Sequence, residues 1–269
     1  MEWLNSAHLV DGLLSHPDIG IKTGIRSFDE ATGGLRTGRF YLVSAASGVG
    51  KTTLMVSLLT ETMIHNPTKR FLYIATEQSV LEIGAKILAH LTCINERKIT
   101  TNELTEEQVV TLKGVEKSLN NVAFQYYDSA SFNLEACLEE ALQNGIDYVF
   151  YDYLGAIADL DDKKEWRTLE TLADRLKRFA TKHNICIFTA TQCSNDIKTV
   201  KEPPEIYDER FIANSKGIAR KADVAFIMVR TNEPNQIWLD MYKNRQMESP
   251  KRLKYSLNYS TNRLREVLL

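Results

Sequence analysis

Short apolar runs of strand length alternate with helix-like segments along most of the chain. The helix-like segments carry apolar residues three and four positions apart, as Leu169, Leu172, Leu176 and Phe179 do. Most of the short apolar runs are continuous, which is typical of strands buried on both faces of a parallel sheet. The pattern predicts helices at residues 52–65, 79–91, 132–143 and 166–183, and strands at residues 40–44, 71–75, 122–127, 148–151, 185–190 and 224–229.

The pattern changes after Val229. Residues 236–242 and 252–257 alternate polar and apolar positions, which indicates antiparallel strands at one edge of the sheet. We therefore expect an α/β fold with a mostly parallel central sheet flanked by helices, and antiparallel edge strands at the C-terminal end. Residues 1–20 are predicted to form an N-terminal linker helix that packs either on its own domain or on a neighbouring subunit. Residues 21–269 are predicted to form one domain.

The composition indicates the general class of protein but does not indicate which molecule it binds. The 269 residues are 43% hydrophobic and 25% charged, as in an ordinary globular protein. Thirty-three Lys and Arg residues stand against 35 Asp and Glu, so a polyanion would have to bind at a local patch. No membrane-length apolar segment or signal peptide is visible, and a cytoplasmic location is expected. The four cysteines form no C-x-x-C pair, which favours buried thiols over a zinc site or disulfides.

The sharpest motif is A-A-S-G-V-G-K-T at residues 45–52, which follows a predicted strand and opens a predicted helix. A bound phosphate requires converging backbone N–H groups, a helix N-terminus and a cation, and this segment offers all of them. Lys51 is expected to reach the β- and γ-phosphates, and the Thr52 hydroxyl is expected to ligate Mg²⁺. The residues predicted to hold the nucleotide are Ala46, Ser47, Gly48, Val49, Gly50, Lys51, Thr52 and Thr53.

Three polar residues follow other predicted strands, at the sheet edge where ligand groups collect. Asp152 ends the strand at 148–151 and is a candidate second magnesium ligand. Glu77 comes shortly after the strand at 71–75, and its carboxylate could polarise the water that attacks the γ-phosphate. Gln192 follows the strand at 185–190, where its amide could sense the γ-phosphate.

Together these motifs resemble the ATPase domain of the DnaB-type hexameric replicative DNA helicases, which has the RecA-like fold of P-loop NTPases. The likeness extends over nearly the whole chain, including residues 23–35, T-E-Q-S at 76–79, D-Y-L at 152–154, T-Q at 191–192 and residues 216–224. K-N-R at 243–245 is similar to the family's pair of basic residues that reaches the neighbouring subunit's nucleotide. The resemblance implies ATP and Mg²⁺ as cofactors and these catalytic residues: Glu77, Lys51, Gln192, Arg245 and Lys243.

Arg245 also has a physical rationale, because a planar guanidinium supplied from outside the pocket stabilises the charge that spreads over the transferred phosphate. The alternative for Lys243 and Arg245 is an exposed turn, since residues 243–265 hold seven basic residues against Glu248 alone. For DNA contact, the resemblance favours Lys216, Asn214 and Arg210, although acidic residues interleave with the basic ones in that loop. Residues 159–164 form a second, more acidic candidate loop.

The resemblance implies an ATP-driven DNA helicase motor of replication that acts as a hexameric ring on single-stranded DNA. Primase and a helicase loader are its expected partners. Full-length members of the family carry an N-terminal domain that binds primase, so the chain is expected to be an excised domain or a shorter relative. Two alternatives stay open at this point: a recombinase-type filament ATPase, and a signalling-type ATPase that binds no nucleic acid.

Overall fold

The computed structural model of the chain describes residue 14 and residues 19–126, 133–154, 165–194, 196–197, 200, 202–212 and 216–267. Within them a nine-stranded sheet has the order β3-β2-β4-β5-β1-β6-β7-β8-β9. Neighbouring strands from β3 to β6 in this order pair in parallel, and those from β6 to β9 pair antiparallel. The strands are β1 (Phe40–Ala45), β2 (Phe71–Ala75), β3 (Val122–Tyr126), β4 (Tyr148–Asp152), β5 (Cys186–Gln192), β6 (Val224–Arg230), β7 (Gln236–Asn244), β8 (Lys251–Asn258) and β9 (Arg263–Glu266).

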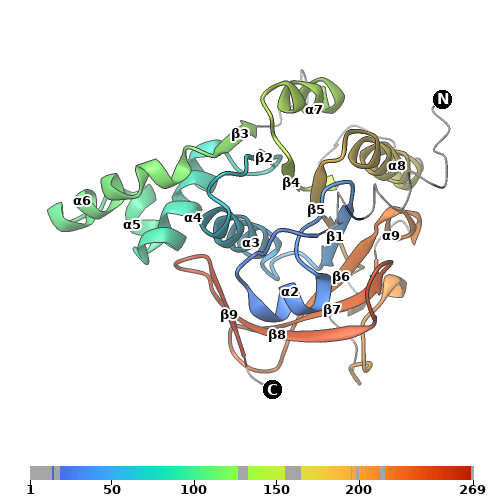
Figure 1. Cartoon of the computed structure of the whole chain (residues 1–269). Coiled ribbons are helices and arrows are strands. Elements are labelled where there is room, and N and C mark those ends of the chain that lie inside the picture. The colour runs from blue at the N-terminus through green and yellow to red at the C-terminus, as the bar shows by residue number, and fades with distance from the viewer. Residues whose placement is uncertain are drawn as a thin grey trace.

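Helices cover both faces of the parallel part of the sheet (Figure 1). The crossovers from β1 to β2 and from β2 to β3 run in one direction across the sheet, while those from β3 to β4 and from β4 to β5 run in the other. Because such crossovers are right-handed, the two groups of helices lie on opposite faces. One face carries α3 (Lys51–His65) and α4 (Val80–Thr92), and the other carries α7 (Leu134–Gln143), α8 (Glu165–His183) and α9 (Lys216–Lys221).

The predicted α/β architecture, with its antiparallel C-terminal strands, is confirmed. Every residue of β1, β2 and β4 is buried, as their continuous apolar sequences require. In β8 buried and partly exposed residues alternate, because only one face of this part of the sheet packs on the core. Within the described residues, no helix combines the length and the apolar character needed to cross a membrane.

Several elements carry too weak an apolar pattern to be predicted. They are α2 (Arg26–Thr32), α5 (Glu96–Thr100), α6 (Glu106–Gly114), the 3₁₀ turns at Glu116–Leu119 and Glu209–Phe211, and the short edge strand β9. The helices α5 and α6 bury none of their residues and project away from the sheet (Figure 1). Their starts depend on local polar contacts instead: the Asn95 side chain caps α5, and Thr105 and Gln108 form a capping box for α6.

The carboxyl ends of the parallel strands all meet at one edge of the sheet. The segment 45–52 leaves β1 there, and Asp152 and Gln192 end β4 and β5 at the same edge. Glu77 lies two residues beyond the end of β2, the strand that pairs with β4. The topology therefore brings four separate segments of the chain to one place, where open parallel sheets bind their ligands.

Candidate nucleotide site

The phosphate loop, residues 45–52, connects the end of β1 to the start of α3. Gly48 and Gly50 have left-handed φ values of 78° and 115°, which glycine adopts without strain. A Cβ at Gly48 would meet nothing within 4 Å, so this side of the loop is open to a ligand. Gly50 precedes α3 and provides no side-chain cap, which leaves the first N–H groups of this 15-residue helix available to an anion.

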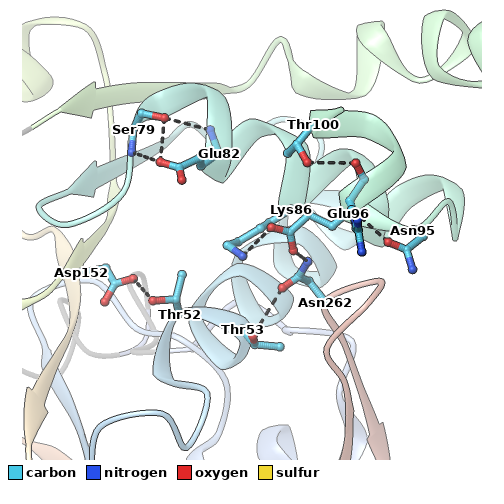
Figure 2. A network of polar contacts seen from close by, with 11 residues as sticks. Thr52, Thr53, Ser79, Glu82, Lys86, Asn95, Glu96, Thr100, Asp152 and Asn262 are labelled. Atoms are coloured by element: carbon cyan, nitrogen blue, oxygen red, sulfur yellow. Dashed lines mark hydrogen bonds and ion pairs between the residues drawn. The ribbon is translucent and has the colours of Figure 1, made fainter. Parts of the chain in front are cut away.

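Thr52 and Asp152 form the polar pair that fits a magnesium ion. The Thr52 hydroxyl donates a hydrogen bond of 2.7 Å to Oδ2 of Asp152, and the Tyr73 hydroxyl donates one of 2.8 Å to the same oxygen. Figure 2 shows the Thr52 and Asp152 side chains pointing toward one another. Burial raises the pKa of Asp152, and the hydroxyl donors and Lys51 oppose that shift. A divalent cation would relieve the cost of this buried carboxylate, and hydroxyl and carboxylate oxygens are the ligands that Mg²⁺ prefers.

Thr76 joins the ends of β2 and β4, and in doing so it places Glu77. Its backbone N–H and its hydroxyl both donate to the carbonyl oxygen of Asp152, at 2.9 and 2.8 Å. The Tyr153 N–H in turn donates to the Thr76 hydroxyl at 2.9 Å. These bonds tie the two strand ends together, and the exposed Glu77 carboxylate lies near Tyr153 and Asp152.

Tyr153 connects three of the predicted site residues and was not itself predicted. Nε2 of Gln192 donates to the Tyr153 hydroxyl at 3.1 Å, and Nζ of Lys51 lies 5.7 Å from the centre of the Tyr153 ring. Burial and then the neighbouring Glu77 carboxylate raise the pKa of Tyr153 to about 12. The protonated hydroxyl thus contacts both Glu77 and Gln192. The sequence signals for Tyr153 are its position directly after the strand that ends at Asp152 and its place in the D-Y-L motif at 152–154.

Thr53 can offer the candidate site only its backbone, because its side chain is engaged elsewhere. Its side chain is buried and donates a hydrogen bond of 3.3 Å to Oδ1 of Asn262, a residue of the β8–β9 turn. The hydroxyl is therefore directed to the turn, and the N–H group of Thr53 remains for a phosphate. Ala46 is also buried and offers only backbone groups to the loop.

Two residues from the antiparallel strands support the phosphate loop and were missed by the sequence analysis. Arg230 ends β6 and donates from Nη2 to the carbonyl oxygen of Gly48. The Tyr259 hydroxyl donates to the carbonyl oxygen of Val49 at 3.0 Å, and its ring lies 5.8 Å from the Arg230 guanidinium carbon. These contacts hold the outer side of the loop. The two residues lie outside any local motif, which explains why pattern reasoning did not find them.

Lys243 and Arg245 lie at the opposite edge of the sheet. Residue 244 at the end of β7 pairs with Val224 at the start of β6, whereas the phosphate loop follows the far end of β1. Nζ of Lys243 donates to the carbonyl oxygens of Ala219 and Arg220 at 2.9 and 3.0 Å. The Arg245 side chain is 52% exposed; its guanidinium lies 3.5 Å from the Asp223 carboxylate and donates to the carbonyl oxygen of Arg220 at 3.1 Å. Both residues of the predicted pair thus lie on the side remote from their own phosphate loop, with Arg245 about half exposed.

We expect the environment of Lys243 to appear in the pH dependence of stability. Desolvation, and then the nearby Arg245, lower the pKa of Lys243 to about 8 from 10.5. As the pH rises through about 8, the folded chain releases this proton while the unfolded chain keeps it, so the free energy of unfolding should rise between pH 8 and pH 10.5. Lys243→Met should lose this rise. Urea unfolding of both proteins at several pH values measures the difference, and parallel curves would contradict it.

Of the predicted DNA contacts, the structure places only one side chain. Arg210 is 66% exposed and its Nε donates to the Asp208 carboxylate at 2.8 Å, which offsets part of its charge. Asn214 lies outside the described residues, as do Lys198, Lys201 and the second candidate loop at 159–164. Lys216 begins α9, and its DNA contact stays a prediction.

The sheet order, the glycine-rich loop opening α3 and the acid at the end of β4 define this chain as a P-loop nucleotide-binding protein of the doubly wound α/β type. A family model places it more narrowly, because the DnaB-like helicase C-terminal domain matches residues 20–258. The chain belongs to that family. The resemblance inferred from the sequence motifs is confirmed.

Relatives and solved structures agree with this assignment. The chain is 26% identical over 258 residues to the SPbeta prophage-derived uncharacterized protein YorI of Bacillus subtilis, covering 86% of this chain and 51% of YorI. It is 24% identical to the replicative DNA helicase DnaB of Mycoplasma genitalium, covering 80% of this chain and 47% of that protein. The chain thus spans about half the length of these relatives.

Solved structures share the fold at low sequence identity. A structure of a single ATPase domain superposes with a TM-score of 0.81 at 15% identity, covering 97% of each chain. A DnaB-like replicative helicase, studied with its primase interactions, superposes with a TM-score of 0.79 at 15% identity, covering 98% of this chain and 67% of that one. The predicted RecA-like arrangement of the sheet is therefore confirmed.

Proposed function

We propose that this chain is the ATP-hydrolysing motor of a replicative DNA helicase and that it acts as a hexameric ring on single-stranded DNA. The position of Arg245 carries the proposal. A six-residue strand is roughly 20 Å long, so a basic pair at one edge of the sheet cannot reach the phosphate loop at the other. A complete site then combines the phosphate loop of one subunit with Arg245 of the next, and Lys243 accompanies it.

The residues at the shared site have separable tasks. The phosphate-loop N–H groups and Lys51 bind the phosphates, and Glu77 accepts a proton from the attacking water. Gln192 contacts the terminal phosphate and, through Tyr153, the residues around it. Magnesium, held by Thr52 and Asp152, supplies positive charge beside the phosphates.

The route from the nucleotide to DNA runs through the chain after β5. A cavity of about 500 Å³ lies between phosphate-loop residues 46–49, the end of β6 and parts of the segment 197–207. That segment leads into the region of Arg210, Asn214 and Lys216, our candidate DNA contacts. A change at the phosphate loop can therefore alter the support of this region. Primase and a helicase loader are proposed partners on the strength of the family alone.

Steady-state hydrolysis of ATP tests the proposal. We expect the rate per subunit to rise several-fold with single-stranded DNA and to rise with protein concentration, because the site is shared between subunits. Lys51→Ala serves as the blank. Hydrolysis that is indifferent to DNA would favour the signalling-type alternative, and a rate independent of concentration would contradict the shared site. A tailed duplex separates a motor, which unwinds it, from a recombinase-type filament, which does not.

A further inference from the structure

Asp240 is a carboxylate inside the antiparallel part of the sheet. It lies in β7 and is fully buried. Arg252 stands directly opposite it on β8, and its guanidinium donates to both carboxylate oxygens, from Nε to Oδ1 and from Nη2 to Oδ2, each at 2.7 Å. Bidentate pairing has one preferred geometry, so it fixes the plane of the guanidinium.

The same ion pair holds the backbone of the segment 203–212, in the connection after β5. The Tyr207 N–H donates to Oδ2 of Asp240 at 2.8 Å. Nη2 of Arg252 donates to the carbonyl oxygen of Pro204 at 3.2 Å. Backbone groups in an irregular segment need such partners, because they lack the hydrogen-bond ladder of a strand. The pair therefore attaches this part of the segment to the sheet.

Aromatic side chains support the attachment. The Arg252 guanidinium carbon lies 4.0 Å from the centre of the Trp238 ring, and stacking on that ring orients the guanidinium. Tyr207 is 5% exposed and belongs to the hydrophobic core. Its ring meets that of Phe211 edge-on, with the ring centres 5.1 Å apart. The segment thus packs on the domain through side chains as well as through its backbone.

A second attachment lies at the end of the segment. The Ser194 N–H donates to the carbonyl oxygen of Phe211 at 2.8 Å, and Cys193 and Ile212 form an antiparallel bridge. Arg210 lies between the two attachments, and its side chain is 66% exposed. The segment is therefore fixed on both sides of Arg210, the candidate DNA contact whose side chain the structure places.

Two roles are open to the buried ion pair. It could serve only to hold β7 and β8 together, but these strands are already paired from Gln236 to Met241. An apolar pair would meet that task as well, because buried ion pairs contribute little net stability compared with apolar packing. An apolar pair could neither accept the Tyr207 N–H nor donate to the Pro204 carbonyl. Those two hydrogen bonds distinguish the second role, which is to position the segment.

We propose that Asp240 is a positioning residue for DNA binding: with Arg252 it fixes residues 204–207 on the sheet, so that Arg210 meets the phosphates of single-stranded DNA in one orientation. This inference rests on the proposed function and assigns a task to the buried ion pair within it. Arg210 makes the contact, and Asp240 acts only through the backbone of the segment. A segment that is already held in place loses less conformational entropy when DNA binds. Removing the pair should weaken DNA binding and spare hydrolysis in the absence of DNA.

The double variant Asp240→Leu/Arg252→Met provides the test, because it removes both charges together and leaves neither buried and unpaired. Binding of a labelled oligothymidine strand is measured by fluorescence anisotropy at several salt concentrations, beside ATP hydrolysis without DNA. We expect DNA affinity to fall about tenfold, while hydrolysis without DNA stays close to the wild-type rate. The slope of log affinity against log salt should shrink by about 0.7, because one phosphate contact is lost. Arg210→Ala should show the same changes, and adding it to the double variant should weaken binding no further.

Glu135→Leu/Arg175→Met is the matched control, since it replaces another acid–arginine pair in the same way, on α7 and α8. It should bind DNA as the wild type does. An unchanged DNA affinity in Asp240→Leu/Arg252→Met would overturn the inference. An equal loss of hydrolysis with and without DNA, or additive losses on combination with Arg210→Ala, would also overturn it, because each indicates a structural role.

If the double variant does not fold, Arg252→Lys carries the same test. An ammonium keeps the charge beside Asp240 but cannot span both the carboxylate and the Pro204 carbonyl. Its DNA affinity should fall in the same direction, and wild-type affinity would contradict the inference. A wild type that hydrolyses ATP but does not bind single-stranded DNA would overturn the proposed function and this inference together. A wild type that binds DNA, with a double variant that binds it equally well, would overturn the inference alone.

Discussion

Arg245→Ala is expected to lower ATP hydrolysis on the order of 10³-fold while the protein still folds and binds nucleotide. The Arg245 side chain is 52% exposed, and its guanidinium makes a 3.5 Å ion pair with Asp223 and a 3.1 Å hydrogen bond to the carbonyl oxygen of Arg220. Asp223 would not be left unpaired in the variant. Nζ of Lys177 donates to its carboxylate at 2.5 Å, and the Phe40 N–H donates to it at 2.9 Å. The variant should lose kcat and keep its KM for ATP. The reason is that the Arg245 guanidinium stabilises the transition state in a neighbouring subunit's site.

Arg175→Ala is the matched control for this variant. Arg175 is 65% exposed and also makes a 3.5 Å ion pair, with Glu135, but lies on α8. Its removal should leave hydrolysis within twofold of the wild type. A similar loss in both variants would indicate general damage to the domain.

Mixing two inactive variants tests whether Arg245 acts between subunits. A ring formed from equal amounts of Arg245→Ala and Lys51→Ala contains interfaces that join an intact phosphate loop to an intact Arg245. Random assembly through head-to-tail interfaces places both on about a quarter of the sites, so about a quarter of the wild-type rate should return. If the equal mixture recovers no ATP hydrolysis, Arg245 does not act in the site of a neighbouring subunit.

Lys51→Ala is expected to lower hydrolysis on the order of 10²–10³-fold, because it removes a preorganised cation from the phosphates. The affinity for Mg–ATP should fall as well, since the lysine binds both the ground state and the transition state. Thermal unfolding is measured alongside hydrolysis, because Nζ of Lys51 also contacts the carbonyl oxygen of Ala45 at 3.4 Å and lies over the Tyr153 ring.

Lys113→Ala, on the exposed surface of α6, controls for the loss of a lysine charge. It should retain wild-type hydrolysis and wild-type affinity. Measurable turnover by Lys51→Ala, above roughly 10% of the wild-type rate on the scale of lost electrostatic contacts, would contradict the assignment of this loop as the phosphate site.

The candidate site was predictable where it depends on contiguous sequence or on a single topological rule. The loop at 45–52 is contiguous, so its glycines, Lys51 and Thr52 are recognisable without any tertiary contact. Asp152 and Gln192 are separated along the chain, but each ends a predicted parallel strand, and parallel strands present their carboxyl ends together. Local pattern and strand direction are enough to place these residues in one site.

The residues that support the phosphate loop and position the other site residues could be predicted neither from a contiguous motif nor from the ends of parallel strands. Tyr153 acquires its role only because its ring meets Lys51 and its hydroxyl meets Gln192. Arg230 and Tyr259 reach the loop from the antiparallel part of the sheet. The helices α5 and α6 were not predicted for a related reason: they bury no residues, so their sequences show no apolar stripe.

The sequence by itself determined the α/β class, the strand directions, the phosphate loop and the family, because apolar periodicity and short motifs are enough to predict each of them. Only the tertiary structure decided that Arg245 lies an entire strand away from its own phosphate loop, because this depends on the register of β6 with β7. It likewise decided that Asn262 contacts Thr53, 209 positions apart along the chain. Contacts over such separations arise when whole helices and strands pack together. The sequence around each residue shows no local pattern from which the contact could be predicted.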